Sequence, residues 1–121
     1  MISITGVPLN IAGAASAAGY IITADAILTE SGATRTLSSV DNGKIIYCTS
    51  ASAVTITCAA GLGAGFSCTI IQAGAGKVTV AAGGQTLVSY SSLFSTMGQY
   101  AVISAICPVA NTFLLAGNLG V

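Results

Sequence analysis

The sequence predicts an all-β fold, an antiparallel jelly-roll-like β-sandwich of about eight strands that follows an extended N-terminal arm. Three observations support this prediction. Short runs of β-branched and other apolar residues follow one another closely along the chain. Glycine, serine and asparagine separate these runs, and the intervals leave no room for helices. Several runs alternate apolar and polar residues, a pattern that places one face in a core and the other in solvent.

The 121 residues divide into an arm over residues 1–31 and a β-sandwich domain over residues 32–121. Apolar residues alternate imperfectly at the start of the arm, and an Ala/Gly/Ser tract over 12–19 follows. Gly13 and Gly19 each weaken a helix there by about 1 kcal/mol relative to alanine. Two interpretations remain open: an arm that needs a neighbouring protein to bury its apolar residues, and a first strand of the domain itself.

The first expected strand covers 34–40, and Asp41-Asn42-Gly43 follows it. An Asn-Gly pair favours positive φ at both central positions of a type I′ turn, so this stretch predicts a hairpin. Asp41 is expected to stabilise its own turn by accepting backbone N–H bonds. The next strand, 44–48, has apolar residues on both faces and is expected to be buried.

The clearest alternation lies over 54–58, where Val54, Ile56 and Cys58 are expected to point inward and two threonines outward. The polar stretch 89–98 is expected to form a loop or a single helical turn. Pro108 is expected to end the longest apolar strand, because proline cannot donate to a ladder. The predicted strands cover 34–40, 44–48, 54–58, 66–70, 78–80, 86–88, 99–107 and 112–116.

Charge is scarce: hydrophobic residues make up 54% of the chain and charged residues 5%, with zero net charge. A typical soluble domain has about 25% charged residues, so much of the surface is expected to face another protein. No basic patch is available to neutralise phosphates, which argues against nucleic acid as a partner. The mean hydropathy of +0.90 raises the question of a membrane. The apolar run 11–24 is too short and too rich in glycine and alanine to span one, and no membrane partner is expected.

The residues that usually carry chemistry are few. The chain has no histidine, so an ordinary Ser–His or Cys–His pair is absent. Its four cysteines, Cys48, Cys58, Cys68 and Cys107, lack zinc or iron–sulfur spacing and are expected to be small core residues. The glycine-rich stretches around 61–65 and 74–77 fail the phosphate-binding patterns and are expected to be turns. We therefore expect a non-enzymatic protein with no cofactor and no metal.

A series of short motifs resembles a β-domain found in tailed-bacteriophage virion proteins, which ends some tail fibres and also occurs as small capsid decoration proteins. The resemblance covers about residues 34–119. It rests on Thr36-Leu37, Asp41-Asn42-Gly43-Lys44-Ile45-Ile46, Val54-Thr55-Ile56-Thr57, Gly65-Phe66, Ile70-Ile71-Gln72, Gly76-Lys77-Val78-Thr79-Val80 and Asn111-Thr112-Phe113-Leu114-Leu115-Ala116-Gly117.

This resemblance implies a homotrimeric β-sandwich assembled without cofactor. A short chain with an arm and one β-domain looks more like a capsid decoration (cement or head-fibre) protein than a tail fibre. It would bind the major capsid protein at the surface of the virion, after assembly in the cytoplasm of the host. The apolar arm residues would make that contact, for example by adding a strand to a free sheet edge: Ile2, Ile4, Val7, Leu9, Ile11, Tyr20 and Ile22.

Two other functions remain open. A receptor-binding tip of a tail fibre would use outer loops such as 89–98, where Tyr90 and Phe94 could contact a host glycan or protein. The same two side chains could equally anchor the loop in the core. A small membrane-associated or secreted β-protein is the third possibility, and only the hydrophobicity favours it.

Overall fold

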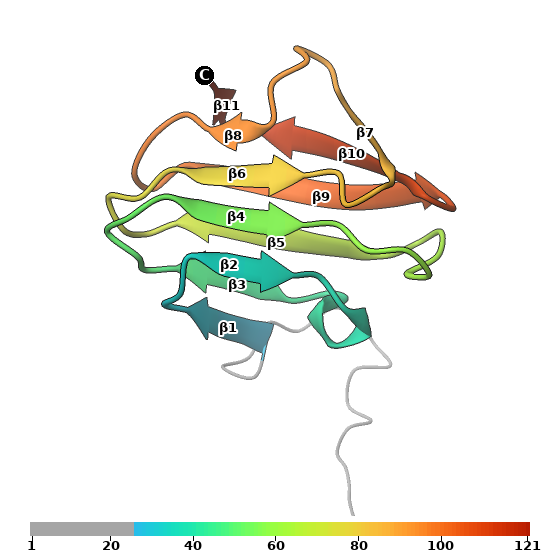
Figure 1. Cartoon of the computed structure of the whole chain (residues 1–121), viewed down its shortest axis with the longest axis horizontal. Helices are drawn as coiled ribbons and strands as arrows, with labels where there is room; N and C mark the ends of the chain where they lie inside the picture. Colours follow the sequence, from blue (N-terminus) through green and yellow to red (C-terminus); the bar gives the residue numbers. More distant parts are fainter. Residues whose placement is uncertain (1–25) are drawn as a thin grey trace, which may run out of the picture.

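The computed structural model describes residues 26–121, and their strands lie in two stacked sheets (Figure 1). The predicted all-β class is confirmed. A single 3-10 turn, η3 (Ser39–Asp41), is the longest helical element among the described residues. The strands are β1 (Ile27–Glu30), β2 (Thr34–Thr36), β3 (Ile45–Cys48), β4 (Val54–Thr57), β5 (Ser67–Gln72), β6 (Val78–Ala81), β7 (Thr86–Ser89), β8 (Ser95–Thr96), β9 (Val102–Val109), β10 (Thr112–Gly117) and β11 (Leu119–Gly120).

The first six strands alternate between the two sheets, and each of β1 to β4 pairs in parallel with the strand two places further along the chain. Thus β1–β2, β3–β4 and β5–β6 form successive rungs, stacked one on another in Figure 1. This path suggests a β-solenoid rather than a jelly roll. The predicted antiparallel pairing of neighbours is wrong for these six strands. Each turn inside a rung carries the chain across to the other sheet instead of back along the same one.

The second half of the chain pairs differently. Strand β9 is antiparallel to both β5 and β10, and β8 is antiparallel to β6 and β11. Strand β7 lies parallel to β10 at the far edge. The six-stranded sheet therefore has the order β1-β3-β5-β9-β10-β7, and the five-stranded sheet has the order β11-β8-β6-β4-β2.

The Asp41-Asn42-Gly43 turn forms, but it is not the predicted type I′ hairpin. Asn42 has φ −62° and ψ 127°, and Gly43 has φ 74°. These angles, with a 3.0 Å bond from the Lys44 N–H to the Asp41 carbonyl, are those of a type II turn. The strands on either side, β2 and β3, belong to different sheets. An Asn-Gly pair permits this geometry as well, because only the second central residue needs positive φ.

The core lies between the two sheets and is built from alternate residues of the strands. The expected burial of Val54, Ile56 and Cys58 is confirmed, with Thr55 exposed between them. The four cysteines are buried and unpaired, as expected for core residues. The cluster comprises Leu37, Ile46, Cys48, Val54, Ile56, Cys58, Phe66, Cys68, Ile70, Val78, Val80, Ile103, Ala105, Cys107, Phe113 and Leu115.

The sheet begins earlier and continues further than the sequence pattern indicated. Ile27–Glu30, which lies within the proposed 1–31 arm, forms β1 and pairs with β3. Pro108 does not end β9, which continues to Val109. The ladder between β9 and β10 shifts register between Ile106 and Val109, so the missing proline N–H falls where the pairing is already irregular.

Glycines let the turns of neighbouring rungs touch. In the turn between β5 and β6, the Gly74 N–H donates to the Cys48 carbonyl at 3.0 Å and the Gly76 N–H to the Ser50 carbonyl at 3.0 Å. A Cβ on Gly76 would lie 1.9 Å from the carbonyl oxygen of Ser52. The expected role of these glycines as turn residues is confirmed, and close approach of two backbones is the reason that glycine is needed.

Candidate binding surfaces

Burial makes the thiols of the chain weak nucleophiles. Desolvation raises the pKa of Cys48 and of Cys58 to about 11, and that of Cys68 to about 12. These three thiols are therefore protonated at neutral pH, whereas the thiolate is the reactive form. Among residues 26–121, no three His, Cys, Asp or Glu side chains gather in a way that could hold a metal ion. The outer faces of the two sheets are the remaining candidates for a functional site in this part of the chain.

The candidate capsid-contact residues of the arm fall outside the part of the chain that the structure describes. This applies to all seven: Ile2, Ile4, Val7, Leu9, Ile11, Tyr20 and Ile22.

The outer face of the five-stranded sheet carries rows of hydroxyl groups. Parallel, in-register pairing aligns Thr34 with Thr55 and Thr55 with Thr79, and antiparallel pairing adds Ser95. The hydroxyls of Thr79 and Ser95 lie 2.9 Å apart, within hydrogen-bond distance. This face is polar and uncharged, as the outward threonines of the sequence pattern predicted.

The outer face of the six-stranded sheet is apolar, and the sequence pattern did not single it out. Tyr47 pairs with Ile71 and Ile71 with Val102, so their side chains form one row across three strands. A second row joins Ile106, Leu114 and Val88. The apolar side chains that point outward from this sheet, named here the apolar face, are Ile27, Ile45, Tyr47, Ile71, Val88, Val102, Ile106 and Leu114.

A hollow of about 170 Å³ lies on the same side of the molecule, beside the 41–44 turn. The Gly43 N–H donates to the Ser67 carbonyl at 2.7 Å, and Asn42 Oδ1 accepts from the Ser67 N–H at 3.1 Å. These bonds hold the turn against the start of β5. The hollow combines hydroxyl groups with one lysine and lies over the central strands β5 and β9, beside Ile106 of the apolar face; it is lined by Gly43, Lys44, Ser67, Cys68, Thr69, Ser104 and Ile106.

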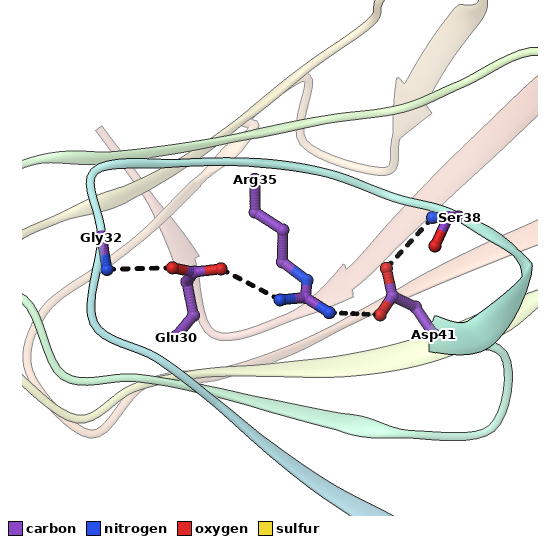
Figure 2. Close-up of polar contacts among 5 residues, drawn as sticks. All are labelled: Glu30, Gly32, Arg35, Ser38 and Asp41. Atoms are coloured by element: carbon purple, nitrogen blue, oxygen red, sulfur yellow. Dashed lines mark hydrogen bonds and ion pairs between the residues drawn. The ribbon is translucent and has the colours of Figure 1, made fainter.

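An ionic network occupies the interior of the first rung, where later rungs have apolar residues (Figure 2). Arg35 points inward from β2 and donates to Glu30 Oε1 at 2.9 Å and to Asp41 Oδ1 at 2.5 Å. The other carboxylate oxygens are also bonded, Glu30 Oε2 by the Gly32 N–H at 2.9 Å and Asp41 Oδ2 by the Ser38 N–H at 3.0 Å. Asp41 is fully buried. The backbone N–H that its side chain accepts belongs to Ser38, which precedes the turn that Asp41 was expected to stabilise, and its partnership with Arg35 was not predicted.

The ionisation of Glu30 makes the stability of the fold depend slightly on pH in the acid range. The Gly32 N–H and then the Arg35 guanidinium lower the pKa of Glu30 below its ordinary 4.5. A lowered folded-state pKa stabilises the fold above the ordinary value, and that stabilisation is lost as the pH falls through the folded-state pKa. The Tm difference between the native chain and Glu30→Gln, measured from about pH 6 to about pH 3, is therefore expected to shrink below about pH 4.5. A difference that stays constant to the acid end would contradict this.

A buried polar pair bridges the two sheets at the middle of the fold. Thr96 of β8 hydrogen-bonds to Gln72 Oε1 of β5, and the Val78 N–H donates to the Thr96 hydroxyl at 3.0 Å. Both side chains are almost completely buried. The alternation of apolar and polar residues does not single out Gln72 or Thr96, because each occupies an inward strand position where an apolar residue would be expected.

Tyr90 and Phe94, the two candidate receptor contacts in the 89–98 stretch, lie in different environments. Tyr90 is fully exposed at the end of β7, whereas Phe94 is partly buried against the core. The stretch also contains the short strand β8, which the expected loop or helical turn did not include. Phe94 thus anchors the segment, and Tyr90 alone is available to a partner.

No protein-family model matches the chain, and no curated protein matches it either. Within residues 26–121, the structure contains no helix with the length and apolar character needed to cross a membrane.

Proposed function

We propose that the chain is a non-enzymatic structural protein of a bacteriophage virion, a trimeric capsid decoration or cement protein that binds the major capsid protein and stabilises the head. The observation that carries this proposal is the pair of charge-free outer faces. The aligned strand residues on both sheets are hydroxyl-bearing, apolar or small. Such surfaces are better suited to permanent contact with other proteins than to exposure on a soluble monomer. The resemblance of the β-domain motifs to phage virion proteins supports the same conclusion.

In this proposal the arm and the β-domain have different roles. The arm would lie on the major capsid protein, and its apolar residues would be buried there. The β-domain would associate with copies of itself and project from the shell or tie neighbouring capsomers together. Binding to the assembled shell and not to its free subunits would stabilise the shell by mass action.

Copy number per particle, measured together with oligomeric mass, tests this function. A decoration protein is expected in high copy on purified virions, and removal of residues 1–22 is expected to release it. The control is the intact chain added back to heads that lack it, which should restore binding and resistance to heat. A chain that never joins a particle would contradict the proposal.

A receptor-binding tip of a tail fibre is the second candidate, and the full exposure of Tyr90 favours it. A tip protein is expected in a few copies per particle and should bind host cells by itself. Tyr90→Ala should then weaken cell binding at least tenfold, while Val40→Ala, at another exposed apolar residue, should not. Partition of the isolated chain into detergent would instead favour the membrane-associated alternative.

A further inference from the structure

The apolar face consists of two ordered rows rather than a scatter of exposed residues, and the outward residues Thr69 and Ser104 lie between the rows. The pairing of β3, β5 and β9 places Tyr47, Ile71 and Val102 in one row. Val102 is 41% exposed. The second row follows from the pairing of β9, β10 and β7. Ile27 and Ile45 extend the surface to the β1 edge. Each row therefore places the apolar side chains of neighbouring strands side by side across part of the sheet.

The two outer faces differ in kind although they belong to one small domain. Aligned positions on the five-stranded sheet carry the hydroxyls of Thr34, Thr55, Thr79 and Ser95, which water can solvate. Two of the aligned rows on the six-stranded sheet carry large aliphatic and aromatic groups, and the row between them carries Thr69 and Ser104. A concentration of exposed apolar residues of this kind marks an interaction site in a soluble protein.

We propose that the apolar face is the self-association surface of the protein, on which copies of this same chain pack against one another. This inference adds detail to the proposed function. It rests on that function only for the expected number of copies, which is three. It names the surface that would surround the symmetry axis. The hydroxyl face of the five-stranded sheet would then remain outward, in water.

Charge is the reason for choosing a second copy as the occupant. The outward strand positions of the six-stranded sheet hold no charged side chain among the described residues, and Lys44 lies before the first residue of β3, beside the hollow. The apolar faces of two copies can therefore meet without burying an ion, which would cost several kcal/mol if left unpaired. The chain has zero net charge, so its copies do not repel one another at long range.

Size decides how much of the face is needed. Six strands about 4.8 Å apart and four residues of about 3.3 Å each give a footprint of about 400 Å². Stable interfaces bury about 800 Å² of accessible surface per partner. Side chains make the accessible area larger than the footprint, so association requires the whole face. A charge placed within one of the two rows should therefore abolish the contact and not merely trim it.

The test compares Val102→Lys, on the central strand β9, with the matched control Thr55→Lys, on the central strand β4 of the other sheet. Both residues point outward and are exposed, so neither lysine needs to enter the core. Sedimentation equilibrium of the intact chain is expected to give the mass of three chains of 11.8 kDa each. Thr55→Lys should keep that mass, and Val102→Lys should weaken association at least 100-fold, with an unchanged circular dichroism spectrum.

Other outcomes overturn the inference. These are a native chain that is monomeric at high concentration, a Val102→Lys chain that keeps the native mass, or dissociation by Thr55→Lys alone. Tyr47→Lys, in the same row, gives the same reading if Val102→Lys does not fold. Monomers that bind neutral phosphatidylcholine vesicles would assign the face to a lipid surface instead. Self-association without virion binding would refute the proposed function and leave this inference standing, whereas virion binding with an unchanged mass for Val102→Lys would do the reverse.

Discussion

Replacing Gly76 by alanine is expected to lower the free energy of unfolding by about 3 kcal/mol, at the upper end of the usual range for overpacking. The added Cβ would lie 1.9 Å from the Ser52 carbonyl oxygen and 2.9 Å from that of Ser50. Both obstacles are backbone atoms, which cannot rotate away as a side chain would. The Gly76 N–H bond to Ser50 would have to break or lengthen as the two turns separate. Urea denaturation followed by circular dichroism measures the loss.

Gly98→Ala is the matched control for this prediction. A Cβ on Gly98 meets nothing within 4 Å, and the residue does not have a positive φ. Its stability should stay within about 0.5 kcal/mol of the native value, as for ordinary surface substitutions. If Gly76→Ala were equally harmless, the turns between β3 and β4 and between β5 and β6 would not be stacked, and the rung arrangement itself would be wrong.

Local signals in the sequence predicted most of the strands, although not β1 or β8, and they did not predict how the strands pair. The alternation at Val54, Ile56 and Cys58 reports only that one face is buried, and it is the same for parallel and antiparallel partners. The glycines at 74 and 76 were identified as turn residues, yet a turn that crosses to a second sheet uses the same residue types as a hairpin. Pairing order is set by contacts between segments about 20 residues apart, which no local pattern encodes.

The candidate surfaces show the same limit. The hydroxyl rows were partly predictable, because each threonine was expected to point outward. The apolar face was not, because the strands that form it have apolar residues on both sides, and a continuous apolar run does not say which side faces the core. Only the register, which places Tyr47 beside Ile71 and Ile71 beside Val102, shows that the outward residues make one surface.

Glu30, Arg35 and Asp41 stand close together in the sequence, but nothing in the sequence indicates that they interact inside the fold. Charged side chains are usually solvated. The structure instead places Arg35 at an inward position of β2, opposite Ile56 of the next rung. At the end of a stack of rungs, one side of the interior lacks a covering rung in the described chain. Hydrogen-bonded polar groups fill the interior there, although the buried Arg35 Nε has no hydrogen-bond partner among the described residues.

Replacing Arg35 by methionine is therefore expected to destabilise the fold by about 3 kcal/mol, the lower end of the range for breaking a buried ion pair. The substitution keeps most of the volume of the side chain but leaves the carboxylate of Asp41, which is fully buried, without its cation. Asp41→Asn should cost less, because Arg35 keeps Glu30 at 2.9 Å and an amide oxygen can still accept from the Ser38 N–H. Chemical denaturation of each variant measures both losses.

The double variant Arg35→Met/Asp41→Asn separates loss of the pair from loss of volume. Once the carboxylate is gone, methionine strands no charge, so the double variant should be more stable than the sum of the two single losses predicts, by about 1–3 kcal/mol. Lys77→Met removes a cation that has no ion pair among the described residues, and it should change stability by less than about 0.5 kcal/mol. Additive losses would mean that Arg35 acts through packing alone, because an uncompensated buried carboxylate is the only source of the expected coupling.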